Sequence, residues 1–190
     1  MNELFGYSLT QFIMVSPEVF QDLHWRYWQA LWPWFCVFIL CNGLVFFKQY
    51  CRLFFCYVSL SWLFIAWVYF KQYLSEVHTF AFIIAALFIL QAAALALVKV
   101  VYFKPFVLDE SIKIRRVIRR AGLLIYGMSA LAPLSLILEN SKGTLLLFGW
   151  GAEQTALGTI GLIVYSYNQK RDLLLVIIPL LWLSFYTLFL

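Results

Sequence analysis

Six apolar stretches of about 18–20 residues dominate the sequence, and short polar segments separate them. At 1.5 Å per residue, a helix of this length crosses a hydrocarbon layer of about 30 Å. The chain is therefore predicted to be all-α, an integral membrane six-helix bundle that forms one transmembrane domain over residues 1–190. The predicted spans are residues 28–47, 53–70, 79–98, 121–138, 148–167 and 173–190.

The amino-acid composition agrees with this interpretation. The chain is 64% hydrophobic and only 12% charged, whereas water-soluble domains are about 25% charged. No segment between two spans exceeds about 22 residues, which leaves no room for a separate soluble catalytic or receptor domain. The function is therefore expected to lie in or at the membrane.

The basic residues are divided unequally between the two sets of alternate segments. Three of the 14 Lys and Arg residues (Arg26, Lys71 and Lys142) lie in the set that includes both termini. The other 11 are Lys48, Arg52, Lys99, Lys104, Lys113, Arg115, Arg116, Arg119, Arg120, Lys170 and Arg171. Because short cationic loops are retained in the cytoplasm during insertion, both termini are predicted to lie outside.

The net charge of +5 is concentrated in segment 99–120. Asp109 and Glu110, followed by apolar residues at helical spacing, predict a short cytoplasmic helix that leads into the fourth span. Its basic residues are expected to contact anionic lipid head groups of the bilayer, at about 1 kcal/mol each; a protein-docking surface is the alternative. Nucleic acid is not an expected partner, because the basic residues are the hinges between spans. The predicted head-group contacts are Lys113, Arg115, Arg116, Arg119 and Arg120.

The N-terminal segment is apolar and carries few charges. Residues 4–15 are predicted to form a short interfacial helix that lies flat on the outer surface. No basic region precedes this stretch and no small-residue cleavage site follows it, so a cleavable signal peptide is not expected.

Three stretches resemble a known family. Residues 7–20, 27–33 and 85–92 read YSLTQFIMVSPEVF, YWQALWP and AALFILQA, and they are similar to small bacterial inner-membrane proteins designated only as a domain of unknown function. The resemblance implies a multi-pass fold in the bacterial inner (plasma) membrane and implies no activity. Family members tend to begin the fifth span with a Pro-Cys-Pro-Thr-type turn and Thr-x-Gly. Here Thr155, Thr159 and Gly161 match, whereas Ala152-Glu153-Gln154 replace Pro-Cys-Pro.

Glu153 is the one acidic residue that the apolar pattern places within a span. An ionised carboxylate there costs a few kcal/mol unless it is paired, hydrated or protonated, and no predicted span contains Lys or Arg. One interpretation is a carboxylate in a polar pocket open to the outside, with Thr155 and Thr159 as further binding residues. The alternative is that Gly149 and Gly151 break the helix and leave Glu153 in a wet turn at the start of the next helix.

Asn42 and Gln91 are predicted to lie at almost the same depth in the first and third spans. A hydrogen bond between them would contribute about 0.6–2 kcal/mol. Structural pairing is one interpretation, and a polar step in a permeation path is the other.

Cysteine and histidine residues predict no metal site. Cys36, Cys41, Cys51 and Cys56 have an i, i+5 spacing that puts the members of each pair about 140° apart on a helix. Small buried hydrophobes are the favoured interpretation over a soft-metal thiolate site. His24 and His78 are predicted outside the membrane, where separate interfacial residues are favoured over an outer metal site. No haem or other cofactor is expected.

Catalytic motifs are not apparent in the sequence, so the chain is not predicted to be an enzyme. The leading hypothesis is a small membrane protein that handles a small solute or ion through an outward-facing polar pocket. The alternative is a non-catalytic accessory or scaffold subunit, which would bind a membrane-protein partner or form a homo-oligomer. A lipid-facing patch of small residues would favour the accessory role, and a water-filled cavity containing Glu153 would favour transport.

Overall fold

Helices make up nearly all of the part of the chain that the computed structural model describes. That part comprises residues 3–4, 7–8, 26, 40–41, 43, 51–73, 75, 81–102, 113–138, 151–167 and 170–189. Helix α4 (Cys51–Phe64) continues as a π-helical segment, η4 (Ile65–Tyr73), and α5 (Ala81–Leu95) continues as η6 (Ala96–Val101). They are followed by α6 (Lys113–Leu138), α7 (Ala152–Tyr165), the 3-10 segment η7 (Lys170–Val176) and α8 (Ile177–Phe189).

The predicted spans from the second to the sixth each overlap one of these helices. Two segments, Arg52–Gln72 and Ala81–Val101, are long and apolar enough to cross a membrane. The helix expected before the fourth span is confirmed, since α6 begins at Lys113 and continues without a break to Leu138. Most of the first predicted span, 28–47, lies outside the described residues.

The N-terminal prediction is wrong where the structure describes that segment. Strands β1 (Glu3–Leu4) and β2 (Tyr7–Ser8) pair antiparallel, with Glu3 opposite Ser8 and Leu4 opposite Tyr7. This pairing uses backbone N–H and carbonyl groups between the two strands, whereas a helix beginning at residue 4 would use them within itself. Residues 9–15 of the predicted interfacial helix lie outside the described residues.

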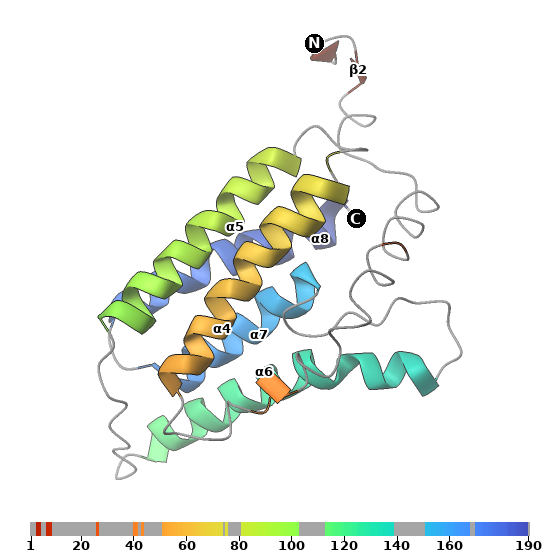
Figure 1. The fold of residues 1–190 in the computed structure, drawn as a ribbon. Helices are drawn as coiled ribbons and strands as arrows, with labels where there is room; N and C mark the ends of the chain where they lie inside the picture. Colours follow the sequence, from red (N-terminus) through yellow and green to blue (C-terminus); the bar gives the residue numbers. More distant parts are fainter. Residues whose placement is uncertain are drawn as a thin grey trace.

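The helices alternate in direction along the chain (Figure 1). In Figure 1, α5 lies on one side and α6 on the other, with α4 and α7 between them and α8 behind α4 and α5. The start of α4, the end of η6, the start of α6 and the end of α7 lie at the same end. We call this the basic end; its described cations are Arg52, Lys99, Arg116, Arg119, Arg120 and Arg171.

Aromatic rings from three parts of the bundle pack together in the interior. The Phe88 ring of α5 lies 4.4 Å from Trp62 of α4 and 4.6 Å from Phe70 of η4, between ring centroids. Trp182 of α8 lies 5.2 Å from Phe70 and 5.4 Å from Phe88. Aromatic rings at these centroid distances gain from tilted and edge-to-face packing. The cluster fixes α8 against α4 and α5.

Glycine allows α6 and α7 to cross with their backbones almost in contact. A Cβ atom on Gly122 would lie 2.5 Å from the Tyr165 backbone nitrogen and 2.6 Å from the Gly161 carbonyl oxygen. A Cβ atom on Gly161 would lie 2.6 Å from the Tyr126 nitrogen and 2.7 Å from the Gly122 oxygen. Membrane helices commonly approach through small residues in this way. The start of α6 is thereby held against the end of α7.

We predict that Gly122→Ala and Gly161→Ala each destabilise the protein. The obstructing atoms are backbone atoms, so the helices must separate, at a cost of about 1–3 kcal/mol. Gly127→Ala is the matched control, because a Cβ there meets nothing within 4 Å and alanine is the better helix former by about 1 kcal/mol. Thermal unfolding in detergent measures all three variants. Equal midpoints for Gly122→Ala and Gly127→Ala would contradict the close crossing.

Candidate functional site

Gln91 bonds to the backbone of the last helical segment. Its side-chain Nε2 donates to the Leu175 carbonyl oxygen at 2.8 Å, and the residue is fully buried. In a regular helix that carbonyl would accept from the backbone N–H of Pro179, which proline lacks. The amide of Gln91 takes the place of that donor. Asn42 lies outside the described residues, so the Asn42–Gln91 pair stays a prediction.

Two further interhelical hydrogen bonds use polar side chains inside the bundle. The Trp62 Nε1 of α4 donates to the Thr159 hydroxyl of α7 at 2.9 Å. The Ser59 hydroxyl of α4 donates to the Ala92 carbonyl of α5 at 2.7 Å. Thr155, like Thr159, is completely buried. The two threonines predicted as binding residues therefore lie in the packed interior, and the sequence identified them as polar without indicating their depth.

Glu153 lies in the first turn of α7. Gly151 precedes the helix in an extended conformation (φ −89°, ψ 140°) as its N-cap residue, and no side chain caps the helix. Glu153 is partly exposed, near the positive end of the helix dipole, which favours an anion. The helix begins at Ala152, directly after Gly151, and residues 148–150 lie outside the described residues, so the predicted break stays a prediction. Pocket and turn remain alternative interpretations of this carboxylate.

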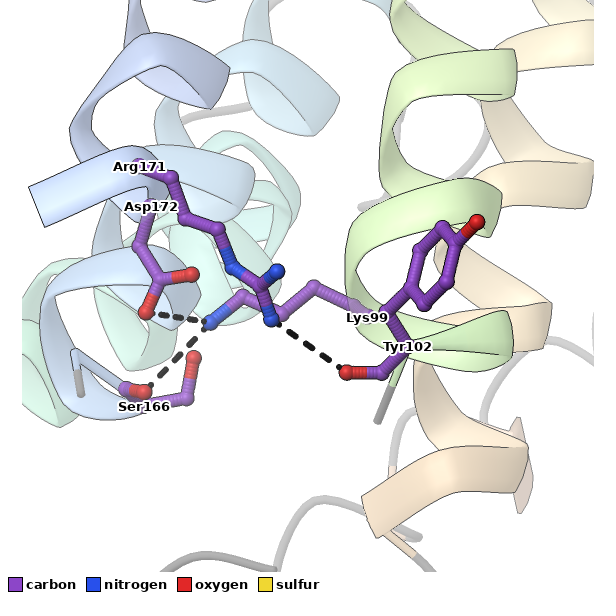
Figure 2. A network of polar contacts seen from close by, with 5 residues as sticks. All are labelled: Lys99, Tyr102, Ser166, Arg171 and Asp172. Carbon is purple, nitrogen blue, oxygen red and sulfur yellow. Dashed lines mark hydrogen bonds and ion pairs between the residues drawn. The ribbon is translucent and has the colours of Figure 1, made fainter. Parts of the chain in front are cut away.

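A buried ion pair joins η6 to η7, and the sequence did not predict it. Lys99 Nζ lies 3.0 Å from Asp172 Oδ2, and the two residues are 7% and 3% exposed. The same ammonium donates to the Ser166 carbonyl oxygen at 3.4 Å and lies 5.5 Å from the centre of the Phe55 ring. Figure 2 shows the Lys99 side chain extending from its helix toward Ser166 and Asp172. The ammonium is thus surrounded by a carboxylate, a carbonyl and an aromatic face.

Arg171 makes a second bridge between the same two segments. Its Nη2 donates to the Tyr102 carbonyl oxygen at 3.3 Å, where Tyr102 ends η6 (Figure 2). Each segment therefore contributes a cation to the other: Lys99 reaches from η6 to the α7–η7 turn, and Arg171 reaches back. We call Lys99, Tyr102, Ser166, Arg171 and Asp172 the polar cluster.

The position of Lys99 within η6 corrects the predicted end of the third span. That span was predicted to stop at residue 98, which placed Lys99 in a loop, whereas the helix continues to Val101 and buries Lys99. Two signals could have revealed the pair. Val100 and Val101 continue the apolar run beyond the lysine, and Asp172 is an acid directly after two basic residues on the predicted cytoplasmic side.

The predicted head-group contacts lie on the first turns of α6. Arg116 and Arg120 are exposed and Arg119 is partly exposed. The side chains of Lys113 and Arg115 lie outside the described residues, although the backbone of both is helical. These arginines are among the residues that define the basic end, and their contact with lipid head groups stays a prediction.

The described cysteines Cys41 and Cys56 are free thiols and partly exposed. Within the described ranges, no group of three or more His, Cys, Asp and Glu residues comes together. Cys36, His24 and His78 lie outside those ranges, and their predicted roles are therefore untested.

Comparison with protein-family models, with curated proteins and with solved structures finds no match to this chain. The resemblance to the bacterial inner-membrane family therefore stays an expectation from the sequence.

We predict that Gln91→Leu destabilises the protein by about 1–3 kcal/mol, because the Leu175 carbonyl loses its donor in an apolar interior. In a Pro179→Ala background the same change should cost much less, since the new backbone N–H of residue 179 can reach that carbonyl. Thermal unfolding in detergent gives both values. The exposed Gln72→Leu is the control and should be near neutral. Additive effects of Gln91→Leu and Pro179→Ala would show that Pro179 is unrelated to the Gln91 bond.

Proposed function

We propose that the protein is a six-span, multi-pass protein of the bacterial inner membrane, with both termini outside, and that it serves as a non-catalytic accessory or scaffold subunit. Two segments apolar enough to cross a membrane support the membrane part of this proposal. The gathering of the described basic residues at one end supports the orientation. A cytoplasmic location of the basic end follows from the retention of cationic loops during insertion.

The internal polar residues favour the accessory role over the transport role. Gln91, Thr159 and Ser59 each take part in a hydrogen bond to another helical segment. A side chain held in such a bond contributes to packing and is not available to a solute without breaking that bond. Of the two residues offered as a polar step in a permeation path, Gln91 is held in such a bond, and Asn42 lies outside the described residues.

The outer face of α5 carries the observation on which the proposal depends. Ala86 and Ala93 are exposed and lie seven residues apart, and Phe82 and Leu90 are exposed on the same side. At 100° per residue these four positions fall within an arc of about 80°. Leu97, at the start of η6, is also exposed. Small residues allow another transmembrane helix to approach closely, and the larger apolar residues then pack around the contact. This face fits a helix of a larger membrane complex or of a second copy.

We predict that a photoreactive residue at Leu90 forms a discrete protein adduct in native membranes. The same probe at Leu124, which is exposed on α6, is the matched control and should label lipid only. Ala86→Leu and Ala93→Leu together should abolish the Leu90 adduct, because their added bulk prevents close approach. Mass analysis of the adduct separates a partner from a second copy. Lipid labelling alone from Leu90 would refute a partner on this face.

Handling of a small solute or ion is the second candidate function. The observation that favours it is the partial exposure of Glu153 in the first turn of α7. Ion or proton exchange at the outer surface would use this carboxylate, and Thr155, two residues later in the same turn, is buried. The proposed outward pocket would open beside these residues.

We predict, for this second candidate, that Glu153→Gln abolishes cation or proton flux in reconstituted vesicles while leaving the helical content unchanged. The amide preserves shape and fixes a neutral side chain, so only the ionisable function is lost. A pH-sensitive dye follows proton entry, with K⁺ and Na⁺ tested separately. Glu139→Gln, a matched acidic change on the predicted outer side, is the control. Wild-type protein without flux above empty vesicles would remove this candidate.

A further inference from the structure

The polar cluster contains two buried polar atoms that are unsatisfied. Ser166 is 6% exposed, and its hydroxyl oxygen has no hydrogen-bond partner within the described part of the chain. The same holds for Nε of Arg171. An unmade hydrogen bond at a buried group costs free energy, so native structures normally fill such positions with protein, water or ligand. The cluster is therefore incomplete by itself.

The charge of the polar cluster indicates the charge of its ligand. Lys99 and Arg171 contribute two positive charges and Asp172 one negative charge, which leaves +1. The unsatisfied atoms are both donors in their usual states: a guanidinium N–H and a hydroxyl. A singly charged oxyanion would neutralise the cluster and accept from both donors. The guanidinium fork matches phosphate oxygens especially well.

The depth of the polar cluster indicates the source of that oxyanion. The apolar segment ends at Val101, and the next residue, Tyr102, is 59% exposed. Tyr167, beside Ser166, is 39% exposed. Tyrosine rings favour the head-group zone, because one end is apolar and the other polar. Lipid phosphates lie at this depth, and Arg171 is itself partly exposed there.

We propose that the polar cluster binds the phosphodiester of an anionic phospholipid at the basic end. The phosphate oxygens accept from the Arg171 guanidinium and the Ser166 hydroxyl. Lys99 keeps its ion pair with Asp172 and adds positive charge beside the phosphate. This site has fixed geometry, unlike the general attraction between lipid head groups and the arginines of α6. It rests on membrane insertion and is independent of the accessory role.

The test is native mass spectrometry of the full-length protein in mild detergent, titrated with phosphatidylglycerol, phosphatidylcholine or inorganic phosphate. The wild-type protein should bind one phosphatidylglycerol in preference to phosphatidylcholine. Arg171→Lys keeps the charge but loses the fork, and should weaken binding by about ten-fold. Ser166→Ala should weaken it by about five-fold without a change of charge. Arg120→Lys, the same substitution at an exposed position of α6, should change it less than about two-fold.

Three results would overturn the proposal. Equal weakening by Arg171→Lys and Arg120→Lys would show that attraction is delocalised. Equal binding of phosphatidylglycerol and phosphatidylcholine would contradict the charge matching. Displacement of the lipid by an equal concentration of inorganic phosphate would show that free phosphate is the ligand. Circular dichroism checks that each variant is folded, and if Arg171→Lys is not, Ser166→Ala decides between a built site and general attraction.

Discussion

A backbone carbonyl that is buried away from water must find its hydrogen-bond donor within the protein. The start of the last helix illustrates this constraint. Pro179 has no N–H for the Leu175 carbonyl, and the buried amide of Gln91 donates to that oxygen from another helix. A 3-10 segment precedes regular α-helix at this point, as expected where proline interrupts the backbone ladder. The backbone donor that proline lacks is thus replaced by a side-chain donor from α5. This hydrogen bond fixes the register of α8 against α5.

Close packing at the glycine crossing positions the polar cluster. Gly161 of α7 faces Gly122 of α6 with almost no space between the backbones, and Ser166 ends α7 a little more than one turn later. The crossing therefore fixes where α7 ends and where η7 begins, and with it the places of Arg171 and Asp172. On the other side, η6 carries Lys99 to the same level. The glycine packing between α6 and α7 and the ion pair between η6 and η7 therefore both position the segment where α7 ends and η7 begins.

Hydropathy predicted where the described helices α4 to α8 lie, and two of the segments are long and apolar enough to cross a membrane. It misplaced the end of the third predicted span, where a charge lies inside the helix. Lys99 was assigned to a loop because cationic residues usually mark loops. Its backbone belongs to η6, and its long side chain carries the ammonium to Asp172. The partners of Gln91 and Thr159 could not be predicted either, because each contact spans more than 80 residues of sequence. Depth along a span follows from the sequence, but the rotation of each helix about its axis is set by packing.

The buried ion pair has a cost that its position helps to offset. Removing an ammonium and a carboxylate from water is expensive, and their mutual attraction alone does not always compensate. Lys99 gains a carbonyl and an aromatic face in addition to Asp172, so the ammonium interacts on several sides. The pair also lies at the end of the apolar segment, near exposed tyrosines, where the dielectric constant rises toward that of water. An apolar pair at these positions could pack as well, but it would not hold η6 and η7 in one defined register. The Lys99–Asp172 pair thus fixes the position of η6 along η7, which apolar packing alone would allow to slide.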